Sequence, residues 1–125
     1  MAVTAVRPAR SRTVLLWALR AGLAGMFLAA GLSKLAGAPE AVELFDDIGA
    51  GQWLRPLVGA LEVAGAVGLF VPRLTRSAAL GLAALMAGAT VVNVVVLGVS
   101  PLLTVLLAAA AVAAAALSSP GSRTR

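Results

Sequence analysis

Four long runs of apolar residues, separated by short polar stretches, dominate the chain. The runs are Thr13–Leu35, Trp53–Val71, Ser77–Leu97 and Pro101–Leu117. An apolar helix of about 20 residues, rising about 1.5 Å per residue, crosses the roughly 30 Å hydrocarbon core of a bilayer. The pattern therefore predicts an all-α membrane protein that forms a bundle of four transmembrane helices.

The connection between the first two runs, residues 34–52, has a pattern of its own. Ala41, Leu44, Phe45 and Ile48 recur at helical spacing, and glycines follow them. This spacing favours a short amphipathic helix on the outer membrane surface or over the end of the bundle. An ordinary loop with solvated acidic side chains is an equal alternative.

The composition supports a membrane protein with a lipid bilayer as its main partner. The chain is 61% hydrophobic and only 12% charged, against about 25% charged residues in soluble domains. Its net charge of +5 would suggest nucleic acid in a soluble chain, but here the basic residues flank the apolar runs, so no nucleic acid is expected. We expect one membrane domain, residues 13–117, between a basic tail, residues 1–12, and a short tail, residues 118–125.

The basic residues also predict an orientation. One side of the membrane would hold Arg7, Arg10, Arg12, Arg73, Arg76, Arg123 and Arg125, and the other only Lys34 and Arg55. Because cytoplasmic loops are rich in Lys and Arg, both termini are predicted to be cytoplasmic, in the plasma (inner) membrane. A cleaved signal peptide is disfavoured, since the first apolar run is too long and Arg20 interrupts it.

Cysteine and histidine are both absent. Their absence excludes disulfides, thiol catalysis, histidine-ligated haem, iron–sulfur clusters and ordinary zinc or copper sites. We therefore expect no intrinsic cofactor, no metal site and no redox catalysis by the chain alone. A redox role would need a partner's cofactor or a diffusible one such as a quinone.

Two opposite charges, Arg20 and Glu62, lie inside apolar runs. A charge at membrane depth costs at least roughly 2.5–3.5 kcal/mol, so such residues normally face the bundle interior and have partners. Counted from the cytoplasmic ends of their runs, they lie about 11 Å and 14 Å deep. Nearly equal depth predicts an Arg20–Glu62 ion pair, which either fixes the helix register or forms a ligand or proton site.

Other residues extend this candidate site. Lys34 shares a helical face with Arg20, and Arg55 shares one with Glu62, whereas small residues on these faces allow close helix contact. The supporting residues are Gly31, Arg55, Gly59, Gly65 and Asn93. We expect Lys34, Arg55 and Asn93 to form a second polar level near the outer end. The alternatives are that Lys34 and Arg55 only extend to the interface and that Asn93 only joins helices.

Several of these residues belong to a pattern that resembles the DoxX-like family of small four-helix membrane proteins. The first run contains Arg20, Gly31 and Lys34-Leu35, and the second contains Gly59-x2-Glu62-x2-Gly65. The resemblance implies a four-helix bundle, with some relatives associated with quinone-linked sulfur oxidation or membrane oxidoreductases. Many relatives carry a histidine near Asn93, and asparagine cannot relay protons as histidine does.

These observations lead to three hypotheses for function. In the first, the protein is an accessory subunit of a membrane redox system and binds an apolar small molecule, such as a quinone, beside Arg20 and Glu62. The second is a small transporter, for which a homodimer would supply additional helices. The third is a structural scaffold that recruits a partner.

Overall fold

The computed structural model describes residues 2–118, which form helices and no strand. The helices are α1 (Ala2–Ala36), α2 (Pro39–Ile48), α3 (Leu54–Gly68), α4 (Thr75–Val91), the π-helical segment η1 (Val92–Leu97) and α5 (Leu102–Leu117). The predicted all-α fold class is confirmed, and each predicted span corresponds to a helix.

The helices differ from the apolar runs in length. Two segments, Arg10–Ala36 and Thr75–Leu97, are long and apolar enough to cross a membrane. The other two, α3 and α5, have 15 and 16 residues, which is about 23 Å each. By contrast, α1 begins at Ala2, well before the predicted start of the first span. Hydropathy marks the residues suited to lipid, but Ala and Arg are good helix formers outside it as well.

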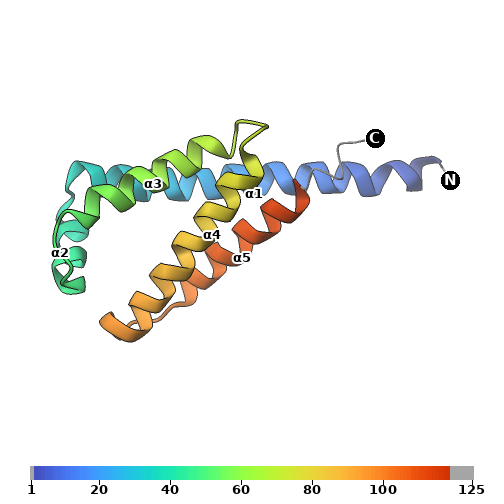
Figure 1. Ribbon diagram of the computed structural model, residues 1–125. Coiled ribbons are helices and arrows are strands. Elements are labelled where there is room, and N and C mark those ends of the chain that lie inside the picture. Colours follow the sequence, from blue (N-terminus) through green and yellow to red (C-terminus); the bar gives the residue numbers. More distant parts are fainter. Residues whose placement is uncertain (1, 119–125) are drawn as a thin grey trace.

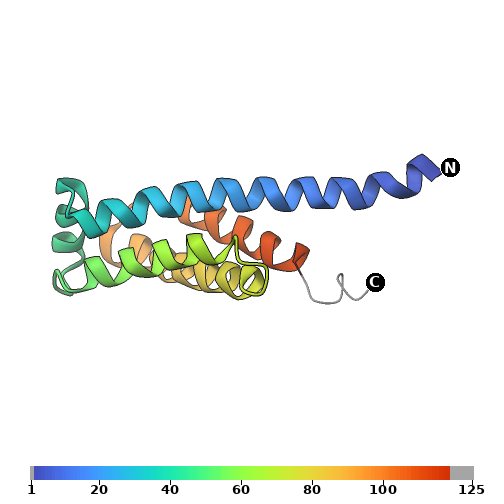
Figure 2. The ribbon, with the colours of Figure 1, turned by 90° about the horizontal axis from the view of Figure 1, so that it is seen from above.

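The four long helices form two antiparallel pairs (Figure 1). In one pair α3 packs along α1, and in the other α5 packs along α4. The second pair crosses the first near the turn between α3 and α4 and diverges from it toward α2 (Figure 1). Figure 2 shows α1 extending beyond the other helices at its N-terminal end. The core lies at the crossing, where Phe27, Leu69 and Leu82 are fully buried.

Glycines determine how closely the helices approach. A Cβ atom added to Gly31 would lie 2.7 Å from the carbonyl oxygen of Gly59, so α1 and α3 touch backbone to backbone there. A Cβ on Gly65 would lie 2.5 Å from Cδ2 of Leu82, which places the crossing of α3 and α4 at Gly65. Small residues are the usual means by which membrane helices come this close.

The connection after α1 forms a short amphipathic helix, which is one of the two alternatives that its sequence left open. Pro39 starts α2, and Gly49 caps its C-terminal end with a left-handed φ of 82°, which suits glycine. Ala41 and Phe45 are buried on its inner face. Because α2 contacts α1, α3 and η1, it covers the end of the bundle where the two helix pairs diverge (Figure 1).

Candidate functional site

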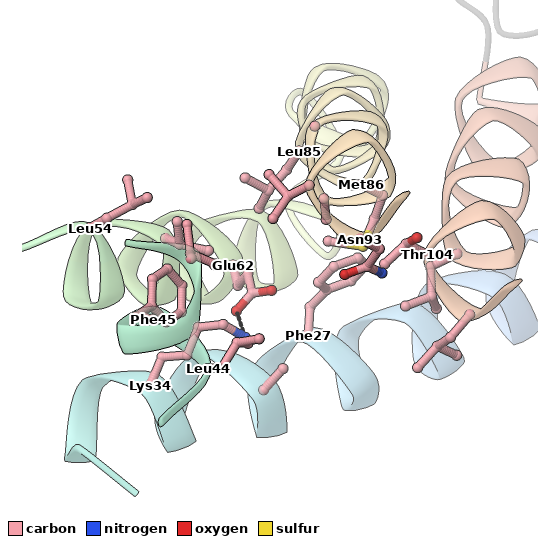
Figure 3. Close-up of a pocket in the computed structure, with 18 of the residues that line it drawn as sticks. Phe27, Lys34, Leu44, Phe45, Leu54, Glu62, Leu85, Met86, Asn93 and Thr104 are labelled. Carbon is pink, nitrogen blue, oxygen red and sulfur yellow. Dashed lines mark ion pairs between the residues drawn. The ribbon is translucent and has the colours of Figure 1, made fainter. Parts of the chain in front are cut away.

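The charged centre of the bundle is an ion pair between α1 and α3. Nζ of Lys34 lies 3.0 Å from Oε1 of Glu62, as Figure 3 shows. Glu62 is only 3% exposed. Oε1 is buried, and the ammonium group of Lys34 is its one partner among the described residues.

The predicted Arg20–Glu62 pair is therefore wrong. Nε of Arg20 donates to the carbonyl oxygen of Leu69 at 2.8 Å, and Nη2 donates to Oγ1 of Thr75 at 2.7 Å. The guanidinium also lies 4.6 Å from the ring centre of Trp17, which adds a cation–π contact. Arg20 thus binds the turn between α3 and α4, where Leu69 has no helical partner for its carbonyl.

The predicted Arg20–Glu62 pair failed because it assumed the wrong axial register between α1 and α3. Equal depth requires the two helices to start at the same level, but α1 extends beyond the turn that follows α3. Arg20 consequently lies beside Leu69, about 10 Å along α3 from Glu62. Lys34 reaches Glu62 because helical side chains point back toward the N-terminus of their own helix, here into the bundle.

A cavity of about 560 Å³ opens beside this ion pair, where the two helix pairs diverge. Phe27 and Met86 line it near the core, and Leu44 and Phe45 line it at the end that α2 covers (Figure 3). Its volume is within the roughly 300–1,000 Å³ typical of small-molecule sites. Lys34 and Glu62 are the only charged side chains among the described residues that line it.

The wall opposite the ion pair carries polar groups from η1 and α5 (Figure 3). Asn93 lines the cavity there, and its side-chain amide makes no hydrogen bond with any of residues 2–118. Thr104 lines it too, and its Oγ1 lies 2.8 Å from Oγ1 of Thr90, which joins α5 to α4. Thr104 was not among the site residues predicted from the sequence, although a threonine shortly after Pro101 in an apolar run is a polar signal.

Arg55 lies at the α2 end of the bundle but outside the cavity. Its Nη1 donates to the carbonyl oxygen of Lys34 near the end of α1, and its Nε donates to Oε1 of Gln52 at 2.9 Å. Nε2 of Gln52 in turn donates to Oδ1 of Asp46 at 2.6 Å and to the carbonyl oxygen of Val42. Arg55 and Gln52 therefore hold α2 in place over the cavity, and Arg55 supports the site indirectly.

The structure thus brings Lys34, Glu62 and Asn93 to one cavity and separates them from Arg20. Gly31, Gly59 and Gly65 allow the helix contacts that frame it. Within residues 2–118 no cluster of acidic side chains is arranged to hold a metal ion. The polar groups on the walls of this apolar cavity are one charge pair, the amide of Asn93 and the hydroxyl of Thr104, which can bind and orient a molecule.

Comparison with known protein families gives a match over most of the chain. The sequence profile of the DoxX-like family matches residues 18–118, which include every helix except the first part of α1. No curated protein and no solved structure matches the chain significantly.

Proposed function

This chain belongs to the DoxX-like family, and from that premise we propose that it assists a quinone-linked membrane redox system. In this proposal it spans the membrane four times and holds a largely apolar molecule beside Lys34 and Glu62. The observation that carries the proposal is the cavity of about 560 Å³, with apolar walls and one buried ion pair.

Four membrane spans would explain why the surface of the molecule is apolar. Large apolar side chains are exposed on every long helix, including Trp17 on α1, Leu61 on α3 and Val112 on α5. Such a surface is unfavourable in water but suits lipid. The shorter α3 and α5 pack beside longer helices, and local thinning of the bilayer costs only fractions of a kcal/mol per Å of mismatch.

The arrangement of charges supports cytoplasmic termini. The exposed Arg12, Arg73 and Arg76 lie at the end of the bundle where α1 begins and α3 meets α4. Arg12 donates a hydrogen bond to the carbonyl oxygen of Leu117, so the end of α5 lies there too. The positive-inside rule assigns this end to the cytoplasm.

A quinone fits the residues of the cavity. Its apolar body suits the side chains of Phe27, Leu85 and Met86, and its oxygens suit Lys34 and the amide of Asn93. When bound, a quinone would supply electron-transfer chemistry that this chain lacks, since it has no Cys or His. The chain's own residues would bind and orient it, and the partner would carry out the redox reaction.

Purification from native membranes in mild detergent, with mass spectrometry of the proteins retained, tests this function. We expect a membrane oxidoreductase subunit to co-purify, and a deletion strain to show a changed ratio of reduced to oxidised quinone. An unchanged ratio together with no such partner would contradict the proposal. Solute flux into liposomes that Glu62→Gln abolishes without unfolding the protein would establish the transporter alternative.

A further inference from the structure

We propose that the cavity selects an uncharged amphiphile that donates a hydroxyl hydrogen bond to Glu62. The inference rests on the proposed function, because it concerns the same cavity, but it specifies which chemical group is recognised. A hydrogen-bond donor, and not apolar shape alone, would then decide what binds.

The first argument is the incomplete hydrogen bonding of Glu62. Its second carboxylate oxygen points into the cavity rather than toward Lys34 (Figure 3), and no described residue donates to it. A carboxylate has about four acceptor positions, and Lys34 is its one charged contact here. This second oxygen is an open acceptor on the cavity wall, so a ligand that donates to it gains a charge-assisted hydrogen bond, whereas a ligand that covers it without a donor leaves it unsatisfied.

The second argument is charge. Lys34 and Glu62 neutralise each other, and no other described residue that lines the cavity is charged. A cationic or anionic ligand would therefore bring an uncompensated charge into an apolar cavity, which is costly. This favours an uncharged donor over an ammonium group or a carboxylate.

The third argument separates a hydroxyl from other uncharged polar groups. A hydroxyl donates one hydrogen bond and also accepts, so it can donate to Glu62 while it accepts from Nζ of Lys34. A ketone, a quinone carbonyl or an ether can only accept, and it leaves the acceptor of Glu62 without a donor. For ligands of the same skeleton, the hydroxyl form should therefore bind more tightly, and of a quinone couple the reduced form should be preferred.

The test compares two probes with the same ring system, 1-naphthol, which carries the hydroxyl donor, and 1-methoxynaphthalene, in which a methyl group replaces the hydroxyl hydrogen. Equilibrium dialysis against the full chain in nanodiscs, with empty nanodiscs subtracted for lipid partition, gives both dissociation constants. A hydrogen bond to a charged group predicts roughly tenfold to hundredfold tighter binding of 1-naphthol. In Glu62→Gln the preference should fall several-fold, whereas Glu43→Gln, on the exposed side of α2, should keep it.

The outcomes distinguish the inference from the function on which it rests. If both probes bind the wild-type protein equally, the donor inference is overturned while the cavity remains a site for apolar molecules. If neither probe binds, both the inference and the proposed cavity function are overturned. Because the wild-type comparison alone decides between these results, the test does not depend on Glu62→Gln folding.

Discussion

Removing one member of the Lys34–Glu62 pair should destabilise the bundle more than removing both. Loss of one partner from a buried ion pair typically costs about 3–5 kcal/mol, because the other charge is left uncompensated. The side chain of Lys34 is 16% exposed and that of Glu62 is 4% exposed. Lys34→Met should therefore be the more harmful change, since a lone Lys34 can extend toward the interface but a lone Glu62 cannot.

The assay is a double-mutant cycle measured as the free energy of unfolding in mild detergent titrated with SDS. Lys34→Met combined with Glu62→Gln should cost at least about 2 kcal/mol less than the sum of the single changes. The control cycle pairs Glu62→Gln with Arg20→Met. Arg20 contacts α3 about 10 Å from Glu62, so these changes should add to within about 0.5 kcal/mol. Additivity in the first cycle, or strong coupling in the control, would refute the observed pairing.

Three further predictions concern packing, the α3–α4 turn and topology. Gly31→Ala should lower the free energy of unfolding in detergent by roughly 1–3 kcal/mol, because the added Cβ would meet the backbone of α3. The control Gly25→Ala has open space around its Cβ, so it should leave the free energy of unfolding unchanged or raise it by up to about 1 kcal/mol. Thr75→Val should cost about 1–3 kcal/mol by leaving a buried arginine donor without its acceptor, and Thr75→Ser should recover most of that loss in the same measurement. In intact cells, an impermeant maleimide should label Asp46→Cys and not Ser119→Cys; equal labelling would contradict four spans or cytoplasmic termini.

Much of the fold could be predicted from the sequence because the signals are local. Apolar runs locate the helices, and the spacing of Ala41 and Phe45 indicates α2. Each signal depends on residues a few positions apart, so no knowledge of tertiary packing was needed. The glycines likewise indicated which helix faces approach closely, although not which helix each face meets.

The pairing of the interior charges could not be predicted in this way. It depends on the axial register of α1 against α3, and the contact between Gly31 and Gly59 fixes that register. Hydropathy gives the limits of a span only to within several residues, and each residue of error moves a side chain by about 1.5 Å. The cavity could not be predicted from the sequence either, because it results from the angle at which the two helix pairs cross at Gly65 and Leu82.

The central claim, that the cavity holds an apolar molecule, is tested most directly by filling it. Gly88 lines the cavity, and a Cβ there meets no atom within 4 Å, so Gly88→Leu should occupy the space without disturbing the helices. Native mass spectrometry of protein released from its own membranes should show a bound apolar molecule in the wild type and in Gly25→Leu, a control outside the cavity. The same molecule should be missing from Gly88→Leu. Equal occupancy in Gly88→Leu, or a wild-type protein that carries no such molecule, would contradict the claim.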